Sequence, residues 1–324
     1  MSKALCNLPD SLLYRYLREK RVKINGKRTK SADTRLFEGD VLELYIADEF
    51  FPEENETAAS YTSDRVVPLE KDEIAYEDDN ILIIDKKAGQ TVHSNLSDEE
   101  QSDKNETFVV DRAIKYLIAT NQYNPLHEQS FTPALCNRLD RNTSGLVIMA
   151  KNAASLRSMN DIIKQRLVKK TYLCEVLGCP KRESATLKDF LYKDRAKNKV
   201  FVFSSSEQAK KVLKLRYDDD IKTIITKYKV LKKLSETSLL QVELVTGRTH
   251  QIRAHLAYIG HPLVGDSKYG VCHEKNPRQR LCSYSLRFEL EGGCWNLSYL
   301  DGRVFYSKRA DFVEKYGLLG EKKK

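Results

Sequence analysis

The sequence predicts an α+β protein whose main domain is a mainly antiparallel mixed sheet, preceded by a small basic unit. Strand-like segments outnumber helical ones, and the helices are interspersed without a strict strand–helix alternation. Two neighbouring segments, "TIITKYKVLKKL" and "TSLLQVELVTG", alternate between apolar and polar residues as paired antiparallel strands do. Regular alternation of strands and helices would instead favour a parallel sheet.

Residues 1–50 are predicted to form the small unit. "LPDSLLYRYLREKR" has an apolar face at helical spacing, "VKINGKR" is a strand that enters an Asn-Gly turn, and "LFEGDVLELYI" adds an alternating strand. Basic residues heavily outnumber acidic ones between Arg15 and Arg35. Residues 51–68 are polar, acidic and poor in aliphatics, which is typical of a linker. The boundaries predicted after it are a main domain at 69–310 and a basic tail at 311–324.

The main domain begins with two strands around the Asp-Asp-Asn turn of "IAYEDDNILIID", a polar loop at 94–107 and a helix, "FVVDRAIKYLIA". "GLVIMAK" is a buried strand, and "NAASLRSMNDIIKQRLV" is a helix capped by Asn152. "KKTYLCEVLG" is a strand, whereas residues 181–222 are charged and predicted to be irregular, except for the strand "KVFVF". The antiparallel pair then leads to "GRTHQIRAHLAYIG", a turn plus a helix that ends at Gly260, and to a last strand, "YSLRFEL".

Composition narrows the function classes. The chain of 324 residues carries a net charge of +9 and has a pI near 9.0, which favours polyanionic partners such as nucleic acid. Its seven cysteines are scattered without a C-x-x-C pair, so reduced thiols in the cytoplasm are expected rather than disulfides or a zinc knuckle. Neither a signal peptide nor a membrane span is predicted. The nucleotide-binding and serine-hydrolase motifs are missing, so no nucleotide cofactor is expected.

The stretch "NRLDRNTSGLVIMAK" places Asp140 between Arg138 and Arg141, just before a strongly apolar run. Nearby guanidinium groups favour the ionised form of a carboxylate, and an ionised Asp can act as a nucleophile. The two arginines would also attract a phosphate backbone. The alternative is a structural salt bridge at the end of a strand.

A second stretch, "TGRTHQIRAHLAYIGHPLVGDSKYG", predicts a tight turn at Gly247 and a helix that Thr249 could help to cap. Arg253 lies one turn into this helix, where it can reach a carboxylate bidentately. Arg248 alone is interpreted as part of a solvated helix start. The three histidines of this stretch lack metal-ligand spacing, so no metal site is predicted. In "KKTYLCEV", Tyr172 lies mid-strand, with Thr171 and Leu173 on the opposite face.

In this order, the segments resemble the RluA family of RNA pseudouridine synthases. The family patterns "HRLDxxTSGLxxxAK" and "GRTHQIRxHLxxxGHPxxGDxxYG" match the two long stretches, "KxYxAxVxG" resembles "KTYLCEVLG", and "VxxKPAGxxVH" resembles "IIDKKAGQTVH". The likeness covers roughly residues 70–307. The N-terminal unit resembles, more weakly, the α-L (ribosomal S-four-like) RNA-binding motif.

The resemblance implies an enzyme that isomerises uridine to pseudouridine in RNA, with large-subunit (23S) rRNA or a pre-ribosomal particle as the partner and without a metal or redox cofactor. Asp140 aligns with the catalytic aspartate, which either attacks the sugar or assists its elimination. Tyr172 aligns with the active-site tyrosine that stacks on the base, and Arg253 with the arginine that pairs with the aspartate. Because a base cannot be modified inside a helix, the target uridine must be flipped out. The residues expected to flip the base or to hold substrate RNA are Arg138, Leu139, Arg141, Arg248 and His250. The residues expected to dock RNA on the N-terminal unit are Arg15, Arg18, Arg21, Lys27 and Arg28.

The chain departs from the family pattern at three places. Asn137 stands where a His is usual, Lys86-Lys87 replaces Lys-Pro, and Leu281 to Ser283 replace "LHA". Two other hypotheses remain open at this point: a ribosome-assembly factor that binds rRNA without chemistry, and a carboxylate-dependent hydrolase.

Overall fold

The computed structural model describes residues 10–29, 31–37, 39–46, 66–93, 107–125, 128, 131–194, 196–214, 220–270 and 278–317. Most of the predicted linker, the loop expected at 94–107 except its last residue, and the last seven residues of the tail lie outside these ranges. The described residues fall into two compact units, the first within Met1–Val67 and Ile114–Thr132 and the second within Pro68–Ala113 and Pro133–Lys324.

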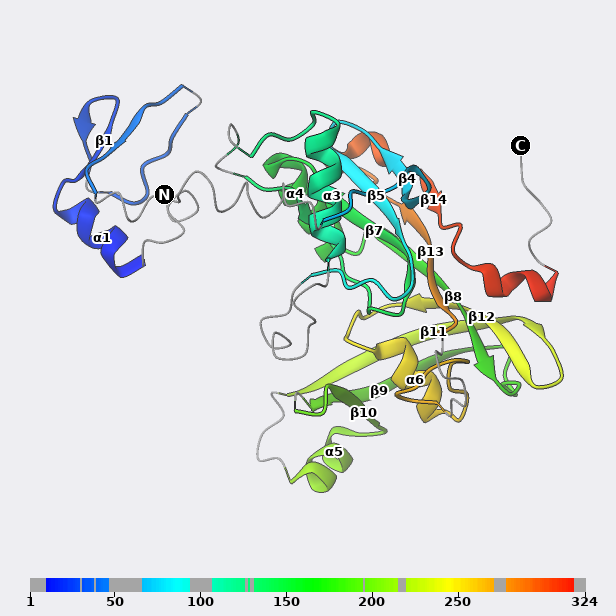
Figure 1. Ribbon diagram of the computed structural model, residues 1–324. Coiled ribbons are helices and arrows are strands. Elements are labelled where there is room, and N and C mark those ends of the chain that lie inside the picture. The colour runs from blue at the N-terminus through cyan, green and yellow to red at the C-terminus, as the bar shows by residue number, and fades with distance from the viewer. Residues whose placement is uncertain are drawn as a thin grey trace. The chain divides into compact units, whose positions relative to one another are not determined.

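The first unit contains a helix and a small sheet (blue in Figure 1). Its elements are α1 (Asp10–Arg18), β1 (Val22–Ile24), β2 (Lys27–Arg28) and β3 (Leu42–Leu44). Strand β1 pairs antiparallel with both β2 and β3. The predicted Asn-Gly turn joins β1 to β2, and Asn25 and Gly26 both have positive φ angles, of 49° and 77°. This arrangement confirms the elements predicted for residues 10–46.

In the described part of the second unit, eleven strands form one sheet, with β10-β9-β11-β12-β8-β13-β7-β5-β4 in order, β14 beside β13 and β6 beside β7. The strands are β4 (Ile74–Glu77), β5 (Ile81–Lys86), β6 (Ala134–Leu135), β7 (Ser144–Ala150), β8 (Val168–Leu177), β9 (Ser184–Asp194), β10 (Lys199–Phe203), β11 (Ile221–Lys233), β12 (Thr237–Leu244), β13 (Leu281–Phe288) and β14 (Val304–Tyr306). The helices are η2 (Lys71–Glu73), α4 (Ala153–Lys164), α5 (Ser206–Leu213), α6 (Gln251–Tyr258), η3 (Ser298–Leu300) and η4 (Asp311–Tyr316), and α3 (Val109–Ala119) begins in this unit. Every pairing is antiparallel except β13 with β7, which confirms the mixed, mainly antiparallel sheet.

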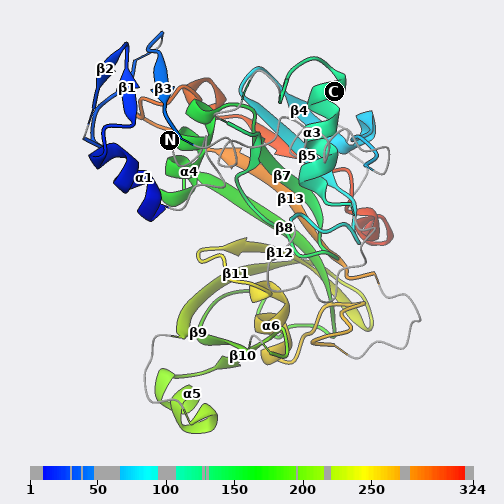
Figure 2. The same ribbon diagram turned by 60° about the vertical axis from the view of Figure 1, so that its left-hand side comes forward.

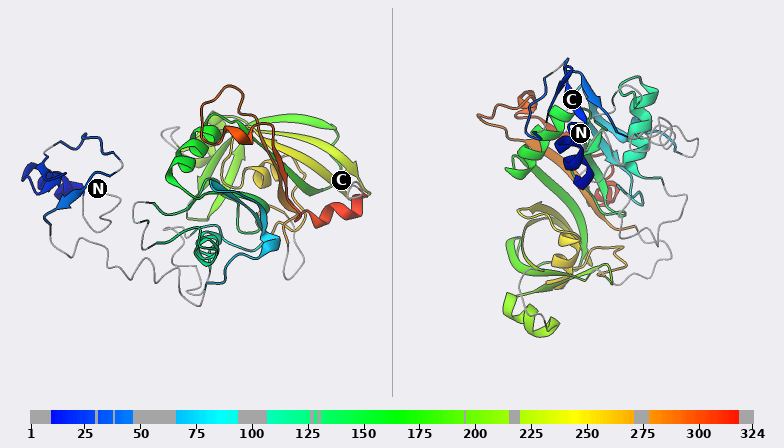
Figure 3. Two further views of the ribbon diagram at one scale, coloured as in Figure 1. Left: turned by 90° about the horizontal axis from the view of Figure 1, so that it is seen from above. Right: turned by 90° about the vertical axis from the view of Figure 1, so that its left-hand side faces the viewer.

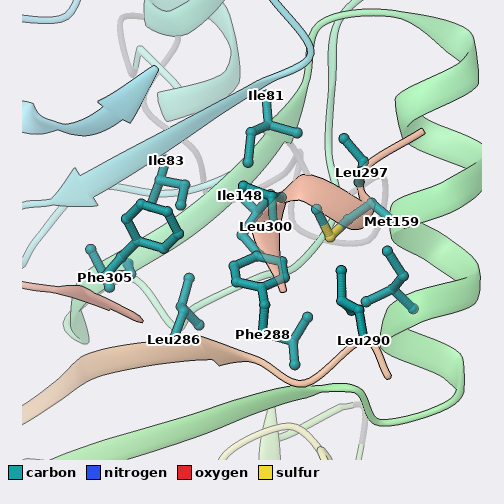
Figure 4. Close-up of a cluster of buried hydrophobic side chains, with 13 residues drawn as sticks. Ile81, Ile83, Ile148, Met159, Leu286, Phe288, Leu290, Leu297, Leu300 and Phe305 are labelled. Atoms are coloured by element: carbon teal, nitrogen blue, oxygen red, sulfur yellow. The ribbon is translucent and has the colours of Figure 1, made fainter. Parts of the chain in front are cut away.

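Helix α4 packs on the sheet around β7. Its apolar residues Met159 and Ile162 pack on β5, β7, β13 and the segment that follows β13 (Figure 4). The predicted cap is present, because the Asn152 side chain accepts a hydrogen bond from the backbone N–H of Ser155. All seven residues of β7 are buried, as expected for a strand covered on both faces.

Residues 181–222 correct the sequence-based expectation, because they contain more regular structure than the strand "KVFVF". The segment from Ser184 to Asp194 is the long strand β9, and α5 follows β10. Exposed and less exposed residues alternate in the first half of β9, from Ser184 to Asp189. The many lysines and acids hid this period, since one face of the strand is solvated.

The first residues of the predicted basic tail also differ from expectation. Residues 311–316 form η4 (red in Figure 3), and Phe312, Val313 and Tyr316 are buried against β8, β12 and β13. Lys315 pairs with the buried Glu175 of β8. This segment therefore belongs to the core of the second unit, on the sheet face opposite Tyr172.

Replacing Phe312 by Ala should lower the free energy of unfolding by about 3 kcal/mol, because it leaves a cavity between η4 and the sheet. Urea unfolding measures this change. Glu314→Ala, on the exposed side of the same turn, is the matched control and should stay within about 0.5 kcal/mol of the parent. Equal losses in both variants would show that η4 is not anchored by its apolar side chains.

None of the helices within the described residues is both long enough and apolar enough to cross a bilayer.

Candidate active site

Asp140 lies on a loop between β6 and β7, and neighbouring segments fix that loop at both ends. Before it, the Asn137 side chain accepts a hydrogen bond of 2.8 Å from the N–H of Ile148. After it, Thr143 N–H donates to the Asp140 carbonyl at 3.0 Å, which closes a tight turn. Strand β7 then passes so close to β13 that a Cβ on Gly145 would lie 2.3 Å from the Ser283 carbonyl oxygen. Asn137 can thus serve as an anchor where the family pattern has His.

Lys86 holds the same loop through hydrogen bonds to backbone carbonyls. Its ammonium, fully buried at the end of β5, donates to the carbonyls of Lys87 (3.1 Å), Gln90 (2.9 Å) and Arg141 (2.9 Å). These acceptors match the three donors of an ammonium. Burial lowers the pKa of Lys86 to about 7, although the Asp140 charge opposes this shift. Lys86 therefore joins the loop that follows β5 to the loop that carries Asp140.

The lowered pKa of Lys86 gives stability a defined pH dependence. Between pH 7 and about 10.5 the unfolded chain holds a proton on this lysine that the folded chain has lost, so the free energy of unfolding should rise with pH. From pH 7 to pH 9 the parent should gain roughly 2 kcal/mol relative to Lys86→Met, which lacks this group. Urea unfolding of both proteins at the two pH values measures the difference. Equal pH dependence would show that Lys86 stays charged throughout this range.

Helix α6 brings the second predicted stretch to the Asp140 loop. It lies inside the curve of β9, β10 and β11 (Figure 2), where Ala254 packs on Leu191, Val200 and Ile224. The residue before the helix is His250, in a left-handed conformation with φ of 52° and without a side-chain capping bond, so the capping predicted for Thr249 was wrong. The Gln251 side chain is the one that accepts the Arg248 N–H, at 3.1 Å.

Buried polar bonds fix α6 against β11 and β9. The Gln251 side chain donates to the Thr226 hydroxyl at 3.0 Å, and His255 lies 2.9 Å from the same hydroxyl. The other ring nitrogen of His255 lies 2.8 Å from an Asp189 carboxylate oxygen. Burial lowers the pKa of His255 despite this carboxylate. A neutral His255 therefore holds the helix in register rather than serving as a metal ligand or a base.

Arg253 connects two carboxylates. Its Nε and Nη2 donate to the two oxygens of Asp266 at 2.8 and 2.9 Å, and its Nη1 donates to Asp140 Oδ2 at 3.1 Å. The Asp266 side chain is 0% exposed and that of Asp140 26% exposed. Burial alone would raise the pKa of Asp266, but Arg253 and the N–H groups of Lys268 and Tyr269 hold it below its usual value. The bidentate contact expected for Arg253 thus goes to Asp266, and its remaining nitrogen presents a positive charge to Asp140.

His250 and Tyr269 border the same carboxylate. The Tyr269 hydroxyl accepts the Val200 N–H at 2.9 Å and lies 2.9 Å from His250 Nδ1. The phenol already accepts the Val200 N–H, so its own proton can go to Nδ1. The ring proton of His250 is then on Nε2, which faces Asp140 Oδ2 at 3.8 Å without a hydrogen bond. Burial lowers the pKa of His250 to about 4; the Asp140 charge opposes this, and the charges of Arg253 and Lys268 add to it. His250 is therefore neutral near pH 7, and it faces Asp140 as a polar group rather than as a cation.

Tyr172 lies on β8 with its ring in the cluster formed with Ile252, Leu256 and Val242. Leu173 packs on the opposite face against η4, which confirms the predicted alternation. Burial raises the pKa of Tyr172 to about 12, and the Asp140 charge adds to this shift while a hydrogen bond with Ser283 opposes it. The phenol is therefore protonated at neutral pH and can donate a hydrogen bond.

The remaining predicted residues of the second unit are distributed more widely. Arg138, Arg141 and Arg248 are exposed, and Arg141 Nε donates to the Gly89 carbonyl at 3.2 Å. Leu139 packs inward against the cluster that contains Tyr172, so its side chain serves the core. Asp140 forms an ion pair of 3.1 Å with Arg253, which is distant in sequence. The two arginines next to Asp140 in the sequence therefore do not account for this ion pair.

On the first unit, the five predicted RNA-docking residues are all exposed. Arg15 and Arg21 each lie 2.9 Å from an oxygen of Glu19, so part of their charge is already compensated.

Carboxylates close enough to hold a metal occur at Glu70, Asp72 and Glu73 within the described residues. Each carboxylate forms an ion pair: Glu70 with Lys87 at 2.7 Å, Asp72 with Arg309 at 2.7 Å, and Glu73 with Arg112 at 2.6 Å. Ion pairs therefore account for this cluster.

Comparison with known proteins decides the family. The model of the RNA pseudouridylate synthase family matches residues 80–258, more than half of the chain. The chain belongs to the RNA pseudouridylate synthase family. It is an isomerase that acts on uridine in RNA. The matched range contains Asp140, Tyr172 and Arg253.

Individual relatives extend over more of this pseudouridylate synthase. It is 30% identical to ribosomal large subunit pseudouridine synthase C of Vibrio cholerae, over 89% of this chain and 78% of the relative. The corresponding protein of Rickettsia bellii is 34% identical, over 81% of this chain and 78% of the relative. The fold is similar to that of human RNA pseudouridylate synthase domain containing 4, with a TM-score of 0.53, 18% identity and coverage of 72% of this chain and 87% of the other.

Two residues of the synthase site were not singled out from the sequence. Asp266 and Tyr269 both lie in "GDSKYG", and Asp266 was the carboxylate available to Arg253 within the same stretch. Lys86 was noted only as part of the Lys86-Lys87 pair that replaces Lys-Pro, and no structural role was predicted for it, although a lysine directly after the apolar run "ILIID" is a signal for a specific buried partner.

Proposed function

We propose that this synthase converts specific uridines of large-subunit (23S) rRNA to pseudouridine in the cytoplasm, with Asp140 as the nucleophile. The observation that carries the assignment of Asp140 is its position, partly exposed and held by Arg253, which is itself fixed by the buried Asp266. Uridines of large-subunit RNA are favoured as the target because the matched relatives from Vibrio cholerae and Rickettsia bellii are named ribosomal large subunit pseudouridine synthases.

The reaction breaks the bond from N1 to C1′ and forms one from C5 to C1′. Asp140 bonds to the ribose while the base detaches, the base turns, C5 attacks the sugar and the carboxylate leaves. The C5 hydrogen passes to solvent and N1 gains a proton, so the product is an isomer of the substrate. Arg253 keeps a positive charge beside the carboxylate, and Tyr172, protonated and buried, offers a ring for the flipped base and a hydroxyl donor.

Loss of the C5 hydrogen provides a direct assay. The experiment incubates the protein with large-subunit RNA that carries tritium at C5 of uridine and was isolated from cells without the gene. Carbodiimide adducts and primer extension then locate the modified positions. Tritium release together with new adducts supports the proposal, whereas RNA binding with neither would favour the rRNA-binding assembly factor. Turnover of a small substrate without RNA would favour the hydrolase.

We propose in addition that the first unit docks structured RNA through its exposed basic side chains. Arg18, Lys27 and Arg28 are exposed and not paired with Glu19, unlike Arg15 and Arg21, so their charges are the most available to phosphates.

Neutralising these three residues, in the variant Arg18→Gln/Lys27→Gln/Arg28→Gln, should weaken binding to the rRNA. The slope of log Kd against log salt should fall by about 0.7–0.9 for each phosphate that the variant no longer binds. Fluorescence anisotropy with labelled rRNA measures both quantities. An Arg15→Gln/Arg21→Gln variant is the comparison and should change the slope less. An unchanged slope in the triple variant would remove the docking role.

A further inference from the structure

Two lysines border the Asp140 site from segments that lie far apart in sequence. Lys199 begins β10, and its ammonium lies 5.5 Å from the centre of the Tyr269 ring. Lys268 precedes Tyr269, and its ammonium donates to the Asn198 carbonyl at 2.7 Å. The Tyr269 hydroxyl accepts the Val200 N–H, so the start of β10 and the loop after α6 are joined at this tyrosine. Both lysine side chains are half-buried and attached to fixed structure.

Among the residues that the structure describes, neither lysine has a carboxylate of its own. Within the described residues, no acidic oxygen lies within 4.0 Å of either ammonium. The nearby acids, Asp140 and Asp266, are both paired with Arg253.

The cluster is therefore positively charged before substrate arrives. Burial lowers the pKa of Lys268, the charges of Arg253 and Lys199 lower it further, and Asp140 and Asp266 oppose the shift. His250 adds no charge near neutral pH, because its pKa lies at about 4. In the described part of the chain, the cations Arg253, Lys199 and Lys268 thus outnumber the anions Asp140 and Asp266. The positive charges repel one another unless another anion binds.

We propose that Lys199 and Lys268 form a subsite for an RNA phosphate attached to the flipped uridine, an inference that rests on the proposed function. If Asp140 is to bond to the ribose, the phosphates on that same ribose must lie within one nucleotide of the carboxylate. The charge of Asp140 raises the pKa of Lys268 and that of Lys199 lowers it, as expected for groups that lie near one another. A backbone phosphate supplies the missing anion, and two lysines hold it without regard to base sequence.

The subsite also has a function in the reaction. A uridine that has left its stack no longer has neighbours to orient it, so a clamp on its phosphate fixes the ribose against Asp140. The lysines act on binding and orientation and make no bond to the reacting atoms. Their loss should therefore affect KM more than kcat.

The test uses Lys199→Gln, Lys268→Gln and the double variant in the full chain, with tritium release from large-subunit RNA labelled at C5. The double variant should raise KM by about tenfold or more and change kcat by less than about threefold. The slope of log kcat/KM against log salt should become shallower by about 0.7 for each lysine removed. Lys199→Arg/Lys268→Arg should restore most of the loss, because it keeps both charges.

Lys197→Gln is the matched control, because this exposed lysine lies two residues away and 3.6 Å from Asp194. It should leave KM and the salt slope unchanged. Binding of labelled RNA, measured by anisotropy at several salt concentrations, is a second measurement that needs no turnover. Replacing Lys268 also removes its hydrogen bond to the Asn198 carbonyl, which could disturb the fold. Lys199→Gln alone keeps this bond, so it tests the subsite independently.

The inference is overturned if the double variant matches the parent in KM, in RNA affinity and in both salt slopes, or if only kcat falls. Failure of the proposed function has a different signature, since the parent itself would then release no tritium.

Discussion

Asp140→Asn should abolish pseudouridine formation while it leaves the fold and RNA binding intact. The amide keeps the size of the side chain and can still accept a hydrogen bond from Arg253, but it is a far weaker nucleophile. Loss of a group that forms a covalent intermediate costs about 10⁴-fold or more in rate. Single-turnover tritium release from C5-labelled large-subunit RNA should therefore fall below detection.

The design of that experiment separates chemistry from folding. Asp79→Asn, an exposed carboxylate in the turn between β4 and β5, is the control and should behave as the parent does. Urea unfolding should place Asp140→Asn within about 1 kcal/mol of the parent, because Arg253 keeps its bidentate contact with Asp266. If Asp140→Asn turns over at a rate within tenfold of the parent, then Asp140 is not the nucleophile.

Arg253→Met should lose both stability and activity, for two separable reasons. Removing the guanidinium leaves the carboxylate of Asp266 buried with two N–H donors but without a counter-ion, which costs about 3–5 kcal/mol of unfolding free energy. It also removes the positive charge beside Asp140, so the rate should fall by at least about a hundredfold. Urea unfolding and tritium release measure the two effects.

A second substitution separates these effects. Arg253→Met/Asp266→Leu removes both members of the buried pair and should recover much of the stability, because no fully buried carboxylate is left without a counter-ion. It should not recover activity, since Asp140 still lacks its partner. Arg253→Lys keeps a charge but cannot contact both carboxylates with the same geometry, and it should be intermediate in both measurements. Recovered activity in the double variant would show that Arg253 acts through stability alone.

The sequence predicted most of the fold because local signals agreed with the tertiary structure. The Asn-Gly turn, the Asn152 cap and the apolar run of β7 each specify one local conformation, and all three are present. Strand β9 and helix α5 were missed because their exposed faces carry so many charged residues that the periodic pattern is weak. Residues 311–316 were assigned to a tail because they precede a basic terminus, and only tertiary packing reveals that Phe312 and Tyr316 are buried.

The sequence was sufficient to predict the main residues of the site, but not most of the contacts between them. The resemblance named Asp140, Tyr172 and Arg253, and Arg253 does contact Asp140. That the bidentate partner is Asp266, and that Lys86 joins the loops below Asp140, depends on contacts between distant segments. No local period encodes such contacts. Lys199 lies outside the family patterns, so its position beside Tyr269 could be found only from the structure.

The most direct test of Asp140-dependent pseudouridine formation is a map of pseudouridines in large-subunit rRNA from cells that lack the gene and are supplied with either the parent or Asp140→Asn. One or more positions should be unmodified without the gene, be restored by the parent, and stay unmodified with Asp140→Asn at equal protein levels. Restoration by both proteins, or a map that does not change when the gene is lost, would contradict it.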